Sequence, residues 1–314
     1  MCHRTAYTVA PNVVLQGRSW GSDESRSARG VVLILHGMGD HIGRYDSFAT
    51  FLAAAGFLVH GYDQRGHGLT GERMKSRGHL GEDGFEQLVR DAHHVIQTLR
   101  HSSPDLPVVV VGHSMGSFVA QSFLTQYGRS IDACILCGSN GPEGTMLHLA
   151  KWLARRTSNL HGPTSTSRLL TRLTFGAYNR AFRPNRTDFD WLSSDPQEVD
   201  LYLRDPHCGF SLSSASMYDM FTTLQNVHRP DRLRQIPNNL PIFIIAGEKD
   251  PLSHFGRGIR RLAALYEKHG MTNVTYKLYP DARHELLHEI NRVEVCRDVL
   301  AWLHANVSRK RVGE

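Results

Sequence analysis

A serine held between two glycines is the residue of this sequence best placed to act as a nucleophile. Gly112-His-Ser-Met-Gly116 follows the valine run 108–111 and precedes the segment 118–127, which is predicted to be a helix. A G-x-S-x-G sequence between a buried strand and a helix forms a sharp turn that lifts the serine above the carboxyl end of the strand. We therefore predict that Ser114 is a nucleophile and that the Met115 N–H faces a developing oxyanion. The alternative is a solvated serine in a glycine turn. It does not explain the candidate acid and base that occur later in the sequence.

Two polar residues late in the chain follow predicted strands and could complete a proton relay. Asp250 comes just after the apolar run 241–247, and His284 just after the run 274–279. The order serine, aspartate, histidine is one of the known orders of catalytic triads. The carboxyl ends of parallel strands share one edge of a sheet, so we expect the three side chains to meet there. His284 would take the proton of Ser114, and Asp250 would hold the imidazole in the required tautomer.

Three other positions could contribute to this site. Glu248 is a rival acid and His288 a rival base, and both are less favourably placed in the sequence. A second oxyanion donor is expected from His36-Gly-Met-Gly39, which follows the buried run 31–35, with the N–H of Met38 as the best candidate. The alternative for this loop is a plain glycine turn with a buried histidine.

The rest of the chain predicts an α/β fold. Short apolar runs alternate with amphipathic helical segments, which predicts a mostly parallel central sheet flanked by helices. From 139 to about 239 this alternation stops, and helices are expected near 146–157, 167–180 and 213–225. That gap is too long for an ordinary connection. We expect an α/β core formed by residues 1–138 and 240–314, with residues 139–239 inserted as a helical cap.

Composition narrows the possible partners. The chain has 314 residues, 40% of them hydrophobic and 21% charged, with a net charge of +6. The positive residues are dispersed apart from the run 309–311, and no basic motif interleaved with aromatic residues indicates nucleic-acid binding. Five cysteines, an odd number, favour a reducing cytoplasm over a disulfide framework. Neither a secretory signal nor an apolar run of membrane-spanning length is predicted.

No cofactor or metal site is expected. Cys134 and Cys137 form a C-x-x-C on a predicted strand, where residues three apart point to opposite faces. His284-Glu-Leu-Leu-His288 is close to the H-E-x-x-H pattern of zinc enzymes, but it begins in a loop and no third ligand is evident.

The motifs described above resemble those of the monoacylglycerol lipase and lysophospholipase branch of the α/β-hydrolases. The resemblance is carried by the stretches 36–45, 63–68, 112–116, 247–250 and 282–285, and in the predicted cap by 194–196 and 205–210. It implies the α/β-hydrolase fold, a triad of Ser114, Asp250 and His284, and oxyanion donors at Met38 and Met115.

Apolar stripes in the predicted cap are candidates for a lipid site. Leu149 and Leu153 lie on one stripe, and Met217 and Phe221 lie on another. Such faces commonly pack against a core. The functional alternative is that these four residues line an acyl-chain tunnel, or that the first cap helix, with its basic flank, makes peripheral contact with a membrane.

Together these residues predict a serine carboxylester hydrolase that acts through an acyl-enzyme on monoacylglycerols, lysophospholipids or related single-chain lipid esters. A short-chain carboxylesterase, thioesterase, perhydrolase or peptidase could use the same triad. A protein of another class, a ligand-binding receptor with a vestigial triad, is the non-enzyme alternative.

Overall fold

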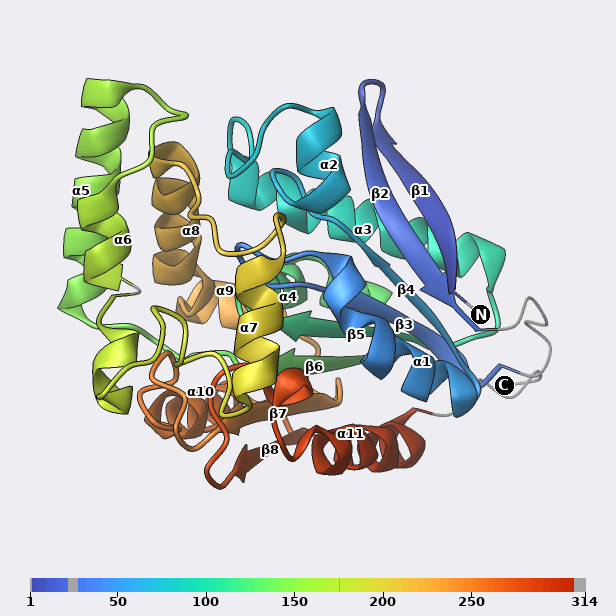
Figure 1. Cartoon of the computed structure of the whole chain (residues 1–314). Helices are drawn as coiled ribbons and strands as arrows, with labels where there is room; N and C mark the ends of the chain where they lie inside the picture. The colour runs from blue at the N-terminus through green and yellow to red at the C-terminus, as the bar shows by residue number, and fades with distance from the viewer. Residues whose placement is uncertain (1, 22–27, 175, 308–314) are drawn as a thin grey trace.

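A mostly parallel sheet of eight strands forms the centre of the molecule (Figure 1). The computed structural model describes residues 2–21, 28–174 and 176–307, so the basic run 309–311 lies outside the described residues. The strand order is β1-β2-β4-β3-β5-β6-β7-β8, with β1 and β2 antiparallel to their neighbours. The predicted α/β class is confirmed. The strands are β1 Cys2–Ala10, β2 Val13–Trp20, β3 Gly30–Leu35, β4 Phe57–Tyr62, β5 Val108–His113, β6 Ala133–Cys137, β7 Ile242–Gly247 and β8 Val274–Tyr279.

The central strands are buried on both faces, which explains their unbroken apolar sequences. All residues of β3, β5, β6 and β7 are buried. On one side of β5, Gly112 pairs with Leu35 of β3. On the other side, His113 pairs with Cys137 of β6. The chain therefore leaves β5 at Ser114 beside the carboxyl ends of two neighbouring strands.

Helices cover the two faces of the sheet in separate sets. Helices α3, α4 and α10 share one core with the sheet, and α1 and α11 share the core on the opposite face. Cys134 belongs to the first core and Cys137 to the second, as their spacing on a strand predicts. The helices outside the 139–239 segment are α1 Asp46–Ala54, α2 Gly68–Arg73, α3 Gly84–Ser102, α4 Met115–Tyr127, α10 Arg257–Lys268 and α11 Arg292–Asn306.

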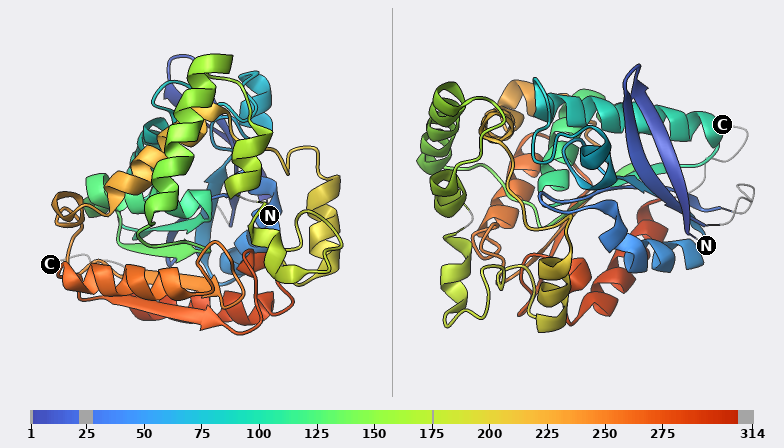
Figure 2. Two further views of the ribbon diagram at one scale, coloured as in Figure 1. Left: turned by 90° about the vertical axis from the view of Figure 1, so that its left-hand side faces the viewer. Right: turned by 45° about the horizontal axis from the view of Figure 1, so that its top comes forward.

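The 139–239 segment runs between the neighbouring strands β6 and β7, and its described residues are helical or irregular, without a strand. Helix α5 packs on α6 and α8, and these three lie together at one end of the sheet, away from the β1–β2 hairpin (Figures 1 and 2). The helices of the segment are α5 Thr145–His161, α6 Arg168–Thr174, α7 Pro196–Arg204, α8 Ser214–Val227 and α9 Pro230–Leu233.

One expected cap helix differs in the structure, and another observed helix was not expected. The helix expected at 167–180 is two shorter pieces, α6 and the 3-10 helix Tyr178–Phe182, because the chain turns at Gly176 and Ala177. Helix α7 was not predicted. In the described part of the chain, no helix has both the length and the apolar character needed to cross a bilayer.

Candidate active site

The backbone at Ser114 is held in a conformation that few non-glycine residues adopt. Its φ is 51° and its ψ is −118°, and its N–H donates to the carbonyl of Cys137 at 3.0 Å. A Cβ on Gly112 would lie 2.4 Å from the carbonyl oxygen of Gly116, and one on Gly116 would lie 2.1 Å from that of Leu35. Both glycines are thus required by close backbone contacts, and the turn raises Ser114 at the start of α4.

The structure brings Ser114, His284 and Asp250 into one hydrogen-bonded chain. His284 Nε2 lies 2.9 Å from Ser114 Oγ, and His284 Nδ1 lies 3.1 Å from Asp250 Oδ2. The other Asp250 oxygen accepts the N–H of Leu252 at 2.9 Å. In this arrangement Nδ1–H donates to the carboxylate and Nε2 is the acceptor for the serine hydroxyl, which is the tautomer required of a general base.

Local turns fix Asp250 and His284 just after the strands that precede them. Asp250 follows β7 in a turn closed by its own N–H to the carbonyl of Gly247 at 3.2 Å. The N–H of Lys249 donates to the carbonyl of Ala282 at 2.9 Å, which joins this turn to the loop that carries His284. Asp250 and His284 are both buried, so the relay lies in a region of low dielectric, where its charge interactions are strong.

Two histidines that lie near each other have opposite pKa shifts. Burial by itself lowers the pKa of His284, but the carboxylates of Asp250, Glu285 and Asp40 together outweigh it, and the pKa of His284 is raised. Burial lowers the pKa of His113 to about 4. The two rings are 5.1 Å apart, so a neutral His113 can lie beside a protonated His284 without two positive charges meeting.

Met38 and Met115 both lie beside the nucleophile. Met38 lines the same small cavity as Ser114 and His284, and Met115 is the first residue of α4. A Cβ on Gly37 would lie 3.3 Å from the Cβ of Ser114, so the Met38 loop passes close to the nucleophile. Among the described residues, no backbone acceptor is found for the N–H of Met38 or of Met115.

The rivals for the acid and the base have other surroundings. Glu248 is exposed, whereas Asp250 is buried against the imidazole. His288 ends the 3-10 helix Leu286–His288, ahead of the last helix α11. Its Nε2 lies 3.0 Å from the carbonyl oxygen of Arg44, so it anchors another loop.

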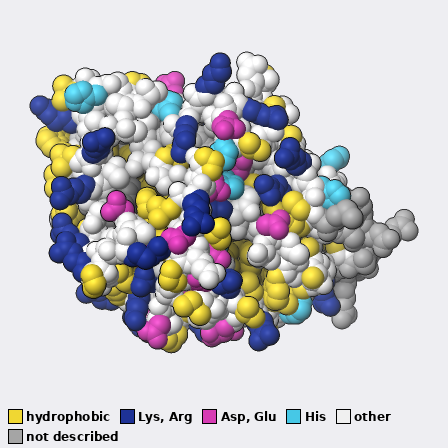
Figure 3. All heavy atoms as spheres, viewed as in Figure 1, with side chains coloured by type: hydrophobic (Ala, Val, Ile, Leu, Met, Phe, Trp, Pro, Cys, Tyr) yellow, Lys and Arg dark blue, Asp and Glu magenta, His cyan; other side chains and the backbone are white. Residues whose placement is uncertain are grey.

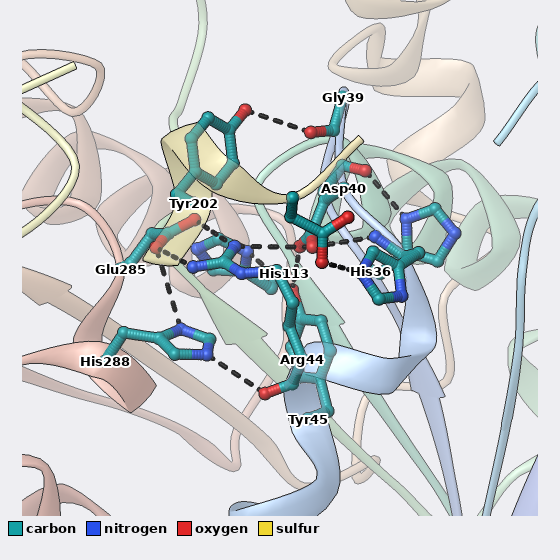
Figure 4. A network of polar contacts seen from close by, with 12 residues as sticks. His36, Gly39, Asp40, Arg44, Tyr45, His113, Tyr202, Glu285 and His288 are labelled. Atoms are coloured by element: carbon teal, nitrogen blue, oxygen red, sulfur yellow. Dashed lines mark hydrogen bonds and ion pairs between the residues drawn. The ribbon is translucent and has the colours of Figure 1, made fainter. Parts of the chain in front are cut away.

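A buried ion-pair network lies behind the relay and was not predicted (Figure 4). Both Glu285 oxygens lie 2.7 Å from Arg44 guanidinium nitrogens, and Arg44 also contacts Asp40 at 3.3 Å. The Tyr45 hydroxyl lies 2.9 Å from Asp40 Oδ2 and 2.9 Å from Nδ1 of His113. The network therefore joins the loop after β3, the nucleophile turn and the residue after His284.

The 139–239 segment reaches the site directly. The Trp191 ring lies 4.9 Å from the His284 ring, and Leu192 accepts the N–H of Glu285 at 2.7 Å. Tyr202 of α7 donates to the carbonyl of Gly39 at 2.9 Å, as Figure 4 shows. Residues inserted between β6 and β7 thus cover His284 and hold the loop of Met38.

Two cavities adjoin at Leu252, and Ser114 lines the smaller of them. A small one of about 100 Å³ contains Ser114, His284 and Met38. An apolar one of about 300 Å³ lies between α5, α8 and the start of α4, and shares Leu252 with the first. Leu149, Leu153 and Phe221 line the apolar cavity. Met217 is not among its lining residues and packs in the main core.

One group of side chains in the described residues has the spacing of metal ligands, namely His41, Asp205 and Cys208. His41 Nδ1 accepts the N–H of Gly43 at 3.2 Å, so Nε2 carries the proton and donates it to Asp205 at 2.9 Å. In this form the pair is a hydrogen bond that ties the loop after β3 to the end of α7.

The fold and the serine-centred relay define the class of protein. This is a serine hydrolase of the α/β-hydrolase fold, and the chain belongs to the family described as serine aminopeptidase, S33, whose family model matches residues 26–291. A monoacylglycerol lipase of Mycolicibacterium smegmatis is 28% identical over 275 residues, which cover 88% of each chain. The mouse monoglyceride lipase is 28% identical, over 92% of this chain and 87% of the mouse protein.

A solved structure extends the similarity over nearly the whole chain. The carboxyl esterase of Bacillus coagulans, in complex with glycerol, matches with a TM-score of 0.89 at 25% identity. The match covers 97% of this chain and 98% of the esterase.

Proposed function

We propose that the chain is a serine carboxylester hydrolase that works through an acyl-enzyme, with Ser114, His284 and Asp250 as its triad. The observation that carries the proposal is that His284 bridges the other two side chains at 2.9 and 3.1 Å. His284 takes the hydroxyl proton while Ser114 Oγ bonds to the ester carbon. The protonated imidazole then gives that proton to the departing alcohol oxygen. Water, deprotonated by His284, releases the acid in the second half of the cycle.

The oxyanion formed in each half is assigned to two backbone donors. We infer that Met38 and Met115 supply these N–H groups, because both lie beside Ser114 and have no backbone acceptor among the described residues. The Met115 N–H is also the first of α4, where the helix dipole favours negative charge.

Single-chain lipid esters fit the cavities next to Ser114. The apolar cavity of about 300 Å³ offers Leu149, Leu153 and Phe221 to an acyl chain. Two relatives that match most of the chain are named as lipases of monoacylglycerols. We propose monoacylglycerols, lysophospholipids or related esters as the substrate class, with residues 139–239 acting as the cap above the site.

Replacement of the nucleophile tests this function. Ser114→Ala should abolish hydrolysis of p-nitrophenyl esters, and a fluorophosphonate should label the wild-type protein at Ser114 alone. Retained turnover in the variant would rule out the assignment. Labelling without repeated turnover would favour the receptor with a vestigial triad.

The family description raises a second candidate, an aminopeptidase. Such an enzyme needs a free carboxylate to bind the substrate ammonium group. The carboxylates of the small cavity, Asp40 and Glu285, are both paired with Arg44, which favours the esterase. Aminoacyl p-nitroanilides and acyl esters, measured side by side, distinguish the two functions. Faster cleavage of the anilides would reverse the choice.

The outer face of α5 supports contact with a membrane surface. Apolar side chains are exposed there beside basic ones, and Figure 3 shows both kinds gathered over α5 and α6. Leu149 also lines the apolar cavity, whereas Trp152 does not, so Trp152→Asp isolates the surface role. We expect this variant to lose binding to liposomes while Leu201→Asp, at an exposed position of α7, retains it. Equal binding by both variants would contradict membrane contact through α5.

A further inference from the structure

A basic groove adjoins the small cavity on a different wall from the apolar one. It has a volume of about 750 Å³ and is lined by Arg77, Arg168 and Arg172. The groove and the small cavity have several lining residues in common, namely Thr171, Phe189, Trp191, Phe210 and Ser211. A molecule bound at Ser114 can therefore extend into the groove without crossing the core.

The three arginines are exposed and form no ion pair with any described carboxylate. Asp188 is the single acidic residue among the lining residues described. Two more arginines, Arg180 and Arg183, line an adjoining hollow that shares Arg172 and Asp188 with the groove. Positive charge thus exceeds negative charge five to one along this wall, and low-dielectric surroundings concentrate the resulting field.

One guanidinium of the groove is held in place before any ligand arrives. Arg77 lies over the ring of Phe210, with its central carbon 4.8 Å from the ring centroid. No hydrogen bond from the Arg77 guanidinium to another described residue is found, so its N–H groups can donate to an anion. Planar guanidinium groups bind phosphate and carboxylate oxygens in pairs, which gives geometric selectivity as well as attraction.

We propose that this groove binds an anionic group on the alcohol side of the substrate ester, with a phosphate or phosphodiester as the matching chemistry. The inference rests on the proposed esterase function, since the acyl chain must enter the apolar cavity for the head group to enter the groove. The preferred substrates would then be single-chain esters with an anionic head group, ahead of neutral monoacylglycerols.

Chain-matched substrates test the proposal. The kcat/KM for 1-hexanoylglycerol 3-phosphate is compared with that for 1-hexanoylglycerol, both as monomers in solution without vesicles. We expect the wild-type protein to prefer the phosphate ester by about tenfold at low salt, and less at high salt because ions screen exposed charges. Arg77→Gln combined with Arg172→Gln should lower this preference by about tenfold, mainly through the phosphate ester.

Arg261→Gln is the matched control, since Arg261 is exposed on α10 and lines none of these cavities. Arg168→Gln is a second test variant. It removes one arginine of the groove and leaves Arg77 in place over Phe210. Equal kcat/KM values for the two substrates, or a preference that survives the arginine variants, would overturn the head-group assignment while leaving the esterase intact. The comparison is then repeated with anionic vesicles present. A preference that appears only with the vesicles would also overturn the assignment, because the surface and not the head group would be recognised. Hydrolysis of neither ester would instead reject the proposed function.

Discussion

Arg44 and Glu285 form a two-pronged ion pair across 241 positions of the chain, with both N–O distances at 2.7 Å. Glu285 follows His284 directly, and Arg44 lies in the 3-10 helix Ile42–Tyr45, shortly after the Met38 loop. Burial alone would raise the pKa of Glu285, but the charge and hydrogen bonds of Arg44 outweigh it and lower the pKa to about 2. The pair therefore remains charged and holds the base beside the loop assigned to the oxyanion.

Glu285→Gln should weaken both folding and catalysis. The buried Arg44 guanidinium would keep one charged partner, the more distant Asp40, and we expect the free energy of unfolding to fall by about 2–4 kcal/mol. Urea unfolding measures this. Asp200→Asn, which removes an exposed ion pair with Arg186, is the control and should change stability by less than about 1 kcal/mol. Equal losses in the two variants would contradict a structural role for the Glu285 pair.

The acidic limb of the pH–rate profile should lie above the ordinary pKa of a histidine. His284 must be neutral to accept the Ser114 proton, and its pKa is raised in the folded protein, so kcat/KM should rise with a midpoint above ~6.5. Glu285 is one of the charges that raise this pKa, so Glu285→Gln should move the midpoint to lower pH. A wild-type midpoint below about 6 would contradict this account of His284.

Gly116→Ala should disrupt the nucleophile turn. The added Cβ would lie 2.1 Å from the carbonyl oxygen of Leu35, which is backbone and cannot rotate away. We expect a loss of about 1–3 kcal/mol in stability and of most ester hydrolysis. Gly144→Ala, at a position with nothing within 4 Å, is the matched control and should retain activity. An active Gly116→Ala protein would show that the turn can accommodate a Cβ at this position, contrary to the structure.

Leu153→Trp should shorten the acyl chain that the site accepts. Leu153 lines the apolar cavity of about 300 Å³, and a larger ring there would occupy space needed by a long chain. We expect kcat/KM for a dodecanoyl p-nitrophenyl ester to fall about tenfold, with little change for the butanoyl ester. Leu201→Trp, at an exposed site on α7, should leave the ratio unchanged. A proportional fall for both esters would place the acyl chain outside the apolar cavity.

The meeting of Ser114 and His284, 170 positions apart, could be expected from the sequence because each follows a strand of one parallel sheet. Helix α7 was missed although a signal was present. Asp195 caps it by accepting the N–H of Gln197 at 3.0 Å, and Pro196 opens it, which is a common start of a helix.

Other parts of the site could not be predicted from any pattern in the local sequence. The Arg44–Glu285 pair depends on which of many charged side chains turn inward, and no periodicity records that choice. The Trp191 ring reaches His284 from an irregular stretch before α7, where the spacing of apolar residues predicts no element. The sequence pattern likewise could not separate Met217, which packs in the core, from Phe221, which lines the cavity, because both lie on one helical stripe.

The most direct test of the account is to trap the covalent intermediate. The protein is mixed with p-nitrophenyl butanoate, quenched in acid within milliseconds, and digested for peptide mass spectrometry. We predict one butanoyl group on the peptide that carries Ser114, and none on that peptide in Ser114→Ala. A butanoyl group at another residue, or rapid turnover without any acylated Ser114, would contradict the central claim.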